Sequence, residues 1–292
     1  MDADLSDFIE THRPLAEREL EALLPGGDAV PDTLRRAMRH AALSPGKRLR
    51  PLLSMMACEA VGARPDKALR FGCAVEFIHA YSLAHDDLPA MDDADLRRGR
   101  PALHKAFDEA TAILAGDALL TLAFETAACA GKGEVAGRLV AELARGAGAA
   151  GMVGGQVLDL EGEGKAIGEK ALETLHGLKT GALMRAALVG GGILGGGDEA
   201  SLDILAAYGS LAGLAFQVAD DLLDLESSAA VLGKDTGNDA AAGKATYPSL
   251  LGAEGARARA RDLADRAEAE ARRLEKGGLL AALARYFVER KT

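Results

Sequence analysis

The sequence predicts an all-α protein in which residues 1–292 form a single helical bundle, one domain around a large central cavity. Alanine and leucine dominate long tracts of the chain, and aromatic residues make up only 4% of it. Alanine and leucine favour helices, whereas aromatic and β-branched residues favour strands. No alternating strand pattern outweighs the helical one. Bundles of this kind build their sites from side chains on facing helices.

Turn residues separate the predicted helices. The first helix covers about residues 4–24 and ends at PGGDAVP, a second reaches about residue 43, and SPGKRLRP then leads into LLSMMACEAV. A helix over about 66–88 ends before Pro89, because proline disfavours helical geometry in the preceding residue. GGGILGGGD at 190–198 is interpreted as a tight turn between helices. Further helices are expected over 101–130, 134–160, 168–190, 199–226 and 246–290.

Composition and charge exclude several classes of protein. The net charge of -10 argues against nucleic-acid binding, which normally needs a basic patch. The N-terminal segment MDADLSDFIE lacks the features of a signal peptide, and no apolar run approaches the roughly 18 residues of a membrane span. We therefore expect a cytoplasmic protein without stable membrane insertion. Cys58, Cys73 and Cys129 are widely spaced, so we expect three buried free thiols rather than disulfides or a zinc site.

Two acidic clusters follow apolar helices. Each contains an Asp-Asp pair and a later aspartate: Asp86, Asp87 and Asp92 in the first, and Asp220, Asp221 and Asp224 in the second. A solvated helix end is the alternative interpretation, but acids at a helix C-terminus oppose the macrodipole. Clustered carboxylates also repel one another unless cations are present. Two such clusters in one chain favour a functional role.

The spacing of the acids points to a metal. Asp220 and Asp224 are four residues apart and share a helix face. Asp86 and Asp92 are six apart, so they meet only if the chain turns at Pro89. Carboxylates without nearby histidine or cysteine suit Mg²⁺, which typically binds one or two carboxylates together with substrate phosphates. The sequence therefore predicts a diphosphate bridged by Mg²⁺.

Basic residues complete the predicted anion site. Guanidinium and ammonium groups are the usual phosphate ligands, although any one of them alone is more typical of a solvated surface. GKRLR is not a P-loop, because the frame GxxxxGK[ST] is absent. The candidates are Lys47, Arg48, Arg50, Arg97, Arg98, Lys179 and Lys234.

At these residues the chain resembles the trans-isoprenyl diphosphate synthases, most closely the bacterial-type farnesyl diphosphate synthases (geranyltranstransferases). HDDLPAMDDADLRRGRP is similar to the first Asp-rich motif of that family in its DDxxxxD form, and GLAFQVADDLLD to the second, DDxxD. The resemblance covers about residues 40–255 and implies the isoprenoid synthase fold. Other matching segments, in the family's order, are GKRLRP, EFIHAYSL, LAGDALL, GMVGGQVLDL, LKTGAL, GKDTGND and KATYPSL.

The resemblance implies a Mg²⁺-dependent prenyltransferase that condenses isopentenyl diphosphate head to tail with dimethylallyl or geranyl diphosphate. It implies three Mg²⁺ ions, for which Mn²⁺ could substitute, and a homodimer. The implied metal ligands are Asp86, Asp92 and Asp220, supported by Asp87, Asp221 and Asp224. The implied allylic diphosphate ligands are Arg97, Lys179, Gln217 and Lys234. The implied catalytic residues are Lys179, Thr180, Gln217 and Lys234. Isopentenyl diphosphate would bind Lys47, Arg50, His79 and Arg98.

His79 and Tyr81 need the resemblance for their roles, because both are also typical of a packed core. Tyr81 lies five residues before Asp86, about 7.5 Å along a helix axis. Its ring would form the floor of the cavity, whereas the neighbouring Ser82 would leave room. In related synthases an aromatic residue at this position accompanies the C15 product, so we expect farnesyl diphosphate.

Several alternatives stay open: a geranylgeranyl (C20) or geranyl (C10) diphosphate synthase, a terpene cyclase, or an inactive regulatory subunit. A cyclase needs no isopentenyl diphosphate site, which argues against it. An inactive subunit would be expected to lose an Asp-rich motif, and both are present. A plain helical scaffold leaves the two acidic clusters unexplained.

Overall fold

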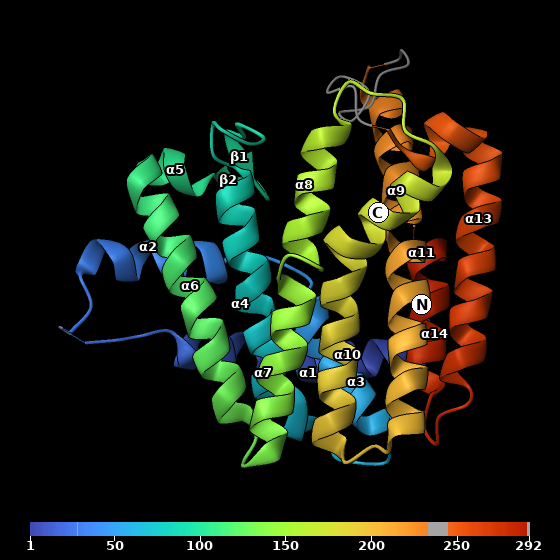
Figure 1. Cartoon of the computed structure of the whole chain (residues 1–292), viewed down its shortest axis with the longest axis horizontal. Helices are drawn as coiled ribbons and strands as arrows, with labels where there is room; N and C mark the ends of the chain where they lie inside the picture. The colour runs from blue at the N-terminus through green and yellow to red at the C-terminus, as the bar shows by residue number, and fades with distance from the viewer. Residues whose placement is uncertain (28, 233–244, 291–292) are drawn as a thin grey trace.

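The computed structural model describes residues 1–27, 29–232 and 245–290. These residues are mostly helical, and the all-α prediction is confirmed (Figure 1). The elements are α1 (Ala3–Leu23), α2 (Asp32–Ala42), α3 (Leu49–Ala60), the 3₁₀ turn η1 (Pro65–Ala68), α4 (Leu69–Asp86), β1 (Leu96–Arg97), β2 (Arg100–Pro101), α5 (Leu103–Ala106), α6 (Glu109–Ala130), α7 (Glu134–Ala147), α8 (Met152–Gly162), α9 (Glu169–His176), the π-helical segment η2 (Gly177–Gly181), α10 (Ala182–Gly195), α11 (Glu199–Leu232), α13 (Tyr247–Ala271) and α14 (Gly278–Glu289).

The helices surround an apolar core built mainly by α3, α4, α6 and α10. Phe71 and Phe77 of α4 and Leu53 of α3 are fully buried in it. A second apolar cluster lies between α11 and α13, where Val218 packs near Leu263. Burial of this apolar surface is the main source of stability in such a bundle.

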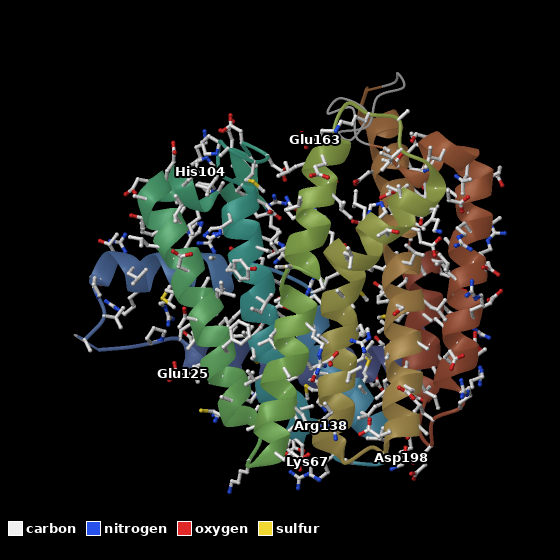
Figure 2. The ribbon with its side chains drawn as sticks, viewed as in Figure 1. Lys67, His104, Glu125, Arg138, Glu163 and Asp198 are labelled. Carbon is white, nitrogen blue, oxygen red and sulfur yellow. The ribbon has the colours of Figure 1, made fainter. Side chains whose placement is uncertain are left out.

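The ends of α4 and α11 define the functional end of the molecule. Both helices run in the same direction, so their C-terminal ends lie at the same end of the bundle, with α8 between them in this view (Figure 1). His104 and Glu163 mark this end, whereas Lys67 and Asp198 mark the opposite one (Figure 2). The two acidic clusters are thereby brought to one end of the bundle, although more than 120 residues separate them in sequence.

Glycines explain where the predicted helix boundaries are wrong. The predicted helix 134–160 is two helices, because the chain turns at 148–151, where a Cβ on Gly151 would overlap the carbonyl oxygen of Arg145. The predicted helix 246–290 is likewise two, α13 and α14. A Cβ on Gly277, just before α14, would overlap the carbonyl oxygen of Ala271.

The glycines at 190–192 behave differently from those in the turns. They lie within α10, where a Cβ on Gly190 would overlap the Phe71 ring and one on Gly191 the carbonyl oxygen of Ser54. The glycines allow α10 to pack closely against α3 and α4. The turn itself comes only at Gly196, which adopts a positive φ of 79°. The predicted turn at 190–198 is therefore too long.

A short hairpin ends at Pro101, and the helix predicted over 101–130 is two helices, α5 and α6, with a break at 107–108. Strand β1 pairs antiparallel with β2, and Leu96 lies opposite Pro101. After α5, Asp108 caps α6 by accepting a hydrogen bond from the backbone N–H of Thr111 at 2.7 Å. Such caps satisfy the free N–H groups at a helix start.

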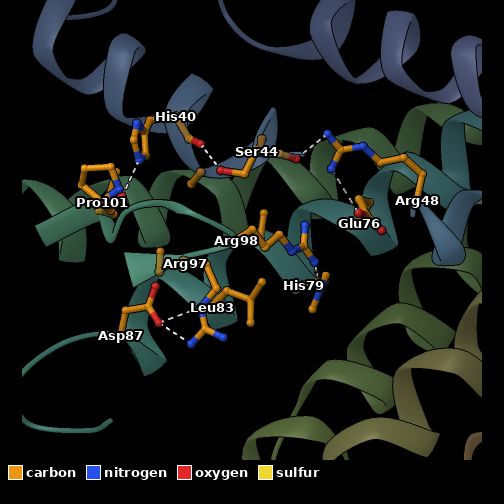
Figure 3. A pocket seen from close by; sticks show the side chains of 15 residues that line it. His40, Ser44, Arg48, Glu76, His79, Leu83, Asp87, Arg97, Arg98 and Pro101 are labelled. Atoms are coloured by element: carbon orange, nitrogen blue, oxygen red, sulfur yellow. Dashed lines mark hydrogen bonds and ion pairs between the residues drawn. The ribbon is translucent and has the colours of Figure 1, made fainter. Parts of the chain in front are cut away.

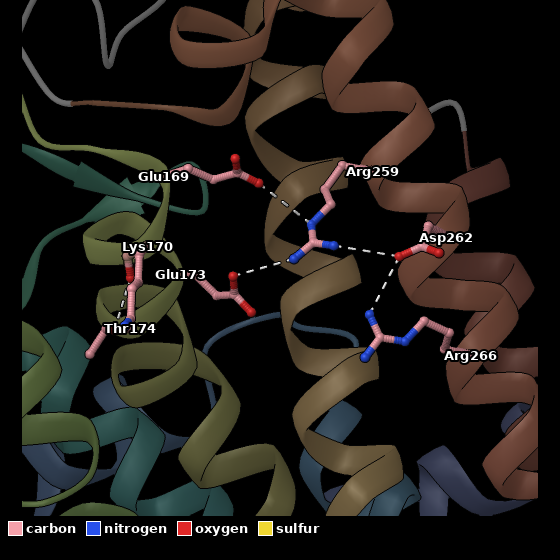
Figure 4. Close-up of polar contacts among 7 residues, drawn as sticks. All are labelled: Glu169, Lys170, Glu173, Thr174, Arg259, Asp262 and Arg266. Carbon is pink, nitrogen blue, oxygen red and sulfur yellow. Dashed lines mark hydrogen bonds and ion pairs between the residues drawn. The ribbon is translucent and has the colours of Figure 1, made fainter.

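Ion pairs fix α9 against α13. Arg259 of α13 lies 3.3 Å from Glu173 and 3.9 Å from Glu169 of α9, and it also contacts Asp262 at 3.4 Å (Figure 4). Because η2 continues directly from α9, this cluster also anchors the segment that carries Lys179 and Thr180.

The expectation of three buried thiols is wrong for one residue. Cys58 and Cys73 are buried, but Cys129 is exposed near the end of α6. By length and composition, α6 and the part of α11 from Glu199 to Glu226 could each cross a membrane. Core helices of water-soluble bundles meet the same criterion, so these two helices do not identify a membrane protein.

Candidate active site

The first acidic cluster forms where α4 ends. The backbone N–H of Asp92 donates to the carbonyl oxygen of Asp86 at 2.8 Å, so the chain folds back as Pro89 predicts. Burial raises the pKa of Asp86 to about 6; the positive charge of Lys179 opposes this shift, and the carboxylate of Asp92 adds to it. Repulsion between the carboxylates and their removal from water therefore disfavour the fully ionised cluster when no cation is bound.

Asp87 faces away from this pair and toward the hairpin. Its side chain is buried and accepts two hydrogen bonds from Arg97, one of them from Nε at 2.9 Å (Figure 3). Arg97 thus ties the hairpin to the end of α4. The charges of Asp87 and Arg97 neutralise each other. Because Asp87 is buried in this pair, it supports the cluster and does not present its carboxylate to the open side of the site.

The four predicted isopentenyl diphosphate ligands lie together. Lys47, Arg50 and Arg98 line a cavity of about 580 Å³ between α1, α3, α4, α11 and α14. Arg98 also lies 3.4 Å from Nε2 of His79 (Figure 3). Burial, together with the charges of Arg50 and Arg98, holds the pKa of His79 well below its usual range, so the ring is neutral.

Glu76 is a member of this region that sequence reasoning missed. It is buried on α4 and lies 3.5 Å from the equally buried guanidinium of Arg48 (Figure 3). Burial lowers the pKa of Arg50 and Arg98, and Glu76 opposes that shift at both. Glu76 is therefore the negative counter-charge of the cationic group formed by Arg48, Arg50 and Arg98. A glutamate inside the apolar segment EFIHAYSL was the available signal.

The backbone is strained in this region. Three non-glycine residues in the described ranges have positive φ: Arg48 at 52°, Asp93 at 46° and Arg98 at 53°. The left-handed conformation is unfavourable for residues with a Cβ, and it is often found at functional sites. Arg48 lies in the segment GKRLRP, and Asp93 and Arg98 lie in the segment that carries the first acidic cluster.

The second acidic cluster is joined to η2 by a chain of hydrogen bonds. Thr180 donates to Oε1 of Gln217 at 3.0 Å, and Nε2 of Gln217 donates to Oδ1 of Asp221 at 3.0 Å. The other oxygen of Asp221 accepts the backbone N–H of Tyr247 at 3.0 Å. Asp221 is buried and is held by the start of α13, so it supports the cluster from behind.

Asp220 and Asp224 lie at the more open side of α11. Asp224 is exposed, whereas Asp220 is half-exposed and accepts a hydrogen bond from Arg290 at 2.8 Å. The guanidinium of Arg290 also stacks on the ring of Phe216, 4.2 Å from its centroid. Arg290 was not predicted, because its place depends on α14 returning to α11.

Lys179 lies in η2, close to Asp159 and to the first acidic cluster. Its Nζ lies 2.6 Å from Oδ2 of Asp159 on α8, and its charge acts on the carboxylate of Asp86. Asp159 was missed as a functional candidate, although it lies in the matching segment GMVGGQVLDL. On the other side of η2, a Cβ on Gly213 would lie 2.8 Å from Cα of Gly181.

The two predicted chain-length residues lie on α4 below the first cluster. The Tyr81 ring is buried and meets the His85 ring edge-on, with 5.8 Å between the centroids. Ser82 is partly buried and donates to the carbonyl oxygen of His79 at 3.0 Å. Lys234, the remaining predicted ligand, lies outside the described residues.

The donor chemistry fits Mg²⁺ shared with a substrate. Among the described residues, no three histidine, cysteine or acidic side chains converge closely enough to hold an ion by themselves. Mg²⁺ commonly takes one or two carboxylates and fills its other positions with water and phosphate oxygens. Asp86 and Asp92 provide carboxylates whose mutual repulsion a cation would relieve.

The chain is similar to known proteins in both its sequence and its fold. The family model described as polyprenyl synthetase matches residues 31–277. The chain is 50% identical over 263 residues to the farnesyl diphosphate synthase of Escherichia coli (strain K12), covering 87% of this chain and 88% of that one. It is 48% identical over 268 residues to geranylgeranyl pyrophosphate synthase 9, chloroplastic, of Arabidopsis thaliana, covering 88% and 74%. A crystal structure of an FPP/GFPP synthase from Zymomonas mobilis superposes with a TM-score of 0.87 at 41% identity, covering 99% and 100%.

Proposed function

The chain belongs to the polyprenyl synthetase family, and from this premise we propose that it condenses isopentenyl diphosphate with dimethylallyl and geranyl diphosphate to give farnesyl diphosphate. The observation that carries the proposal is the meeting of three groups at one end of the bundle. These are the Asp86–Asp92 pair, Lys179 beside it, and the cationic cavity lined by Arg50 and Arg98. Two diphosphates held side by side need two anion sites of this kind.

The proposed reaction breaks the C–O bond of the allylic diphosphate and forms a C–C bond to the isopentenyl double bond. Bound Mg²⁺ would supply positive charge to the departing diphosphate. Asp86, Asp92 and Asp220 are the proposed metal ligands, and the ammonium of Lys179 binds the same diphosphate. The oxygens of Thr180 and Gln217 line the path of the developing carbocation. The proton lost in the last step goes to the released diphosphate.

The isopentenyl diphosphate is proposed to lie in the cationic cavity. Lys47, Arg50 and Arg98 hold its phosphates, and the neutral ring of His79 contributes a hydrogen bond. Holding both substrates in one orientation converts their encounter into an intramolecular step, which accounts for a large part of catalysis in such reactions.

The C15 product length is the finer part of the proposal and rests on Tyr81. Its buried ring on α4 would stop the growing chain below the first acidic cluster. Geranylgeranyl diphosphate is the second candidate, because relatives named as geranylgeranyl synthases are about as similar to the chain as relatives named as farnesyl synthases. A C10 product would require a floor closer to the cluster.

We further propose a cytoplasmic, single-domain enzyme that forms a homodimer. Two helices carry exposed apolar side chains: Ile113 and Leu114 on α6, and Val153 and Val157 on α8. Exposed apolar surface of this kind is typical of an interface between subunits. Light scattering would detect the dimer, and a monomeric mass at micromolar concentration would contradict it.

The test of the proposed activity is incubation with dimethylallyl and isopentenyl diphosphates, with and without Mg²⁺, followed by measurement of product size. We expect Mg²⁺-dependent consumption of isopentenyl diphosphate and a C15 product. A C20 product would correct the product length only. The absence of Mg²⁺-dependent consumption would overturn the whole proposal.

A further inference from the structure

One face of α8 contacts Lys179 at both its backbone and its ammonium group. Gly155 and Asp159 are four residues apart on α8 and therefore share a helix face. Gly155 lies against the backbone of Lys179, and Asp159 accepts a hydrogen bond from its Nζ at 2.6 Å. The lysine thus lies along a single turn of the neighbouring helix.

The contact at Gly155 leaves no room for a side chain. A Cβ on this glycine would overlap the backbone nitrogen of Lys179 and lie 2.5 Å from its Cα, and it would be 2.8 Å from the carbonyl carbon of Leu178. These are backbone atoms, which cannot rotate away as the end of a side chain can. The absence of a Cβ therefore sets how closely η2 approaches α8.

The contact at Asp159 fixes the other end of the lysine. The side chain of Asp159 is 14% exposed and that of Lys179 is 27% exposed, so the pair is shielded from water. A shielded pair is stronger and better defined than one on the surface. A flexible four-carbon side chain would otherwise sample many rotamers, which lowers its affinity for any fixed anion.

We infer that Gly155 and Asp159 are positioning residues that hold the ammonium of Lys179 at the allylic diphosphate. Gly155 sets how closely the backbone of Lys179 approaches α8, and Asp159 sets the direction of the Lys179 side chain. The inference rests on the proposed function of Lys179 as a diphosphate ligand. It assigns Gly155 and Asp159 of α8 to the functional residues of the site, although neither contacts the substrate.

The experiment combines Asp159→Asn and Gly155→Ala with Lys179→Met. We expect Asp159→Asn to raise the KM for the allylic diphosphate about tenfold, within the range of measured pairwise couplings, and to leave the KM for isopentenyl diphosphate within twofold. In the Lys179→Met background the same change should have an effect of less than twofold. A residue that only stabilises the helices would lower the active fraction and leave both KM values unchanged.

Matched controls come from the same helix. Glu161 is exposed, and a Cβ on Gly162 would make only ordinary contacts, 3.9 and 4.0 Å from Ile167. Glu161→Gln and Gly162→Ala should leave both KM values unchanged. Thermal unfolding of each variant shows whether it folds. If Gly155→Ala does not fold, the comparison of Asp159→Asn with Glu161→Gln decides the question alone.

A second readout separates this inference from the proposed activity. Calorimetric titration with inorganic pyrophosphate in Mg²⁺ should show that Asp159→Asn and Gly155→Ala bind pyrophosphate more weakly than the wild-type protein does. When Lys179 is already replaced by methionine, the same two changes should not weaken binding further. If the wild-type protein binds pyrophosphate in this way but turns over no substrate, the proposed function fails and the positioning role stands. Equal effects with and without Lys179, or a lower KM in Asp159→Asn, overturn the positioning role.

Discussion

Arg290 donates a hydrogen bond to Asp220 at 2.8 Å and so pairs a cation from beyond α14 with the second acidic cluster. The Arg290 side chain is 4% exposed, whereas that of Asp220 is 48% exposed. Arg290 also lines the cavity that holds Lys47 and Arg50. The pair therefore joins the two proposed diphosphate sites, and a cation that binds the Asp220 oxygen contacted by Arg290 would compete with this guanidinium.

Replacement of Arg290 by glutamine is expected to strengthen Mg²⁺ binding. The half-saturating Mg²⁺ concentration should fall about two- to fivefold, because a partly exposed ion pair contributes up to about 1 kcal/mol. Activity measured against Mg²⁺ concentration at saturating substrate tests this. Arg285→Gln is the control, since Arg285 lies on α14 and pairs with Glu268 of α13 rather than with an acidic residue of the site. A higher Mg²⁺ requirement in Arg290→Gln would contradict the prediction.

Removal of the Tyr81 ring is expected to lengthen the product. Tyr81→Ala opens space on α4 below the first cluster, so the main product should shift from C15 toward C20. Tyr81→Phe keeps the ring and should keep the C15 product. Chromatography of the dephosphorylated products measures the ratio. If the alanine and phenylalanine variants give the same products, the ring is packed core and does not set chain length.

Two aspartates of the second cluster should differ in their effect on stability. Asp221→Ala leaves the backbone N–H of Tyr247 and the amide of Gln217 without an acceptor. Such a loss costs about 1–3 kcal/mol of unfolding free energy. Asp224 is exposed, so water screens the interactions of its side chain, and Asp224→Ala should cost less than about 1 kcal/mol. Urea unfolding without Mg²⁺ measures both. Equal losses would mean that Asp221 does not anchor α13.

The cysteines should react with iodoacetamide in a fixed order. Burial raises the pKa of the Cys58 thiol to about 11, and burial raises the pKa of Cys73 well above its usual value. The thiolate is the reactive form, so the labelling rate of Cys58 should increase about tenfold per pH unit up to its pKa. Near pH 8 the native protein should be labelled at Cys129. Mass spectrometry after timed labelling checks this; comparable rates at Cys58 and Cys129 would refute it.

Local chemistry made parts of this molecule predictable from sequence. The return of Asp92 to Asp86 follows from Pro89, since a proline ends a helix by its own geometry. A glycine does not predict one local structure in this way. Gly151 stands in the tight turn just before α8, whereas Gly190 lies inside a helix and accommodates the Phe71 ring. The neighbouring elements decide which role applies, and a local pattern does not contain them.

The same limit explains which site residues were missed. Glu76, Asp159 and Arg290 take their places from partners 28, 20 and 70 residues away in the chain. Each is a charged residue whose own neighbourhood in the sequence is unremarkable or apolar. The acids and bases that we propose to contact substrate or metal stand in dense clusters, which the sequence analysis detected. The residues that hold them in place depend on the packing of helices, which a local pattern does not contain.

The left-handed residues Arg48, Asp93 and Arg98 have a consequence for engineering this protein. Each such conformation costs a non-glycine residue about 1–2 kcal/mol, which glycine would avoid. A library selected for heat resistance alone would therefore enrich glycine at Asp93 and Arg98. At Arg48 the buried ion pair with Glu76 opposes the exchange, because its loss would leave a buried carboxylate unpaired. At Asp93 the exchange removes an exposed side chain with no proposed role, but at Arg98 it removes a proposed phosphate ligand. Selection for thermal survival must be combined with a screen for turnover, or it will remove the site.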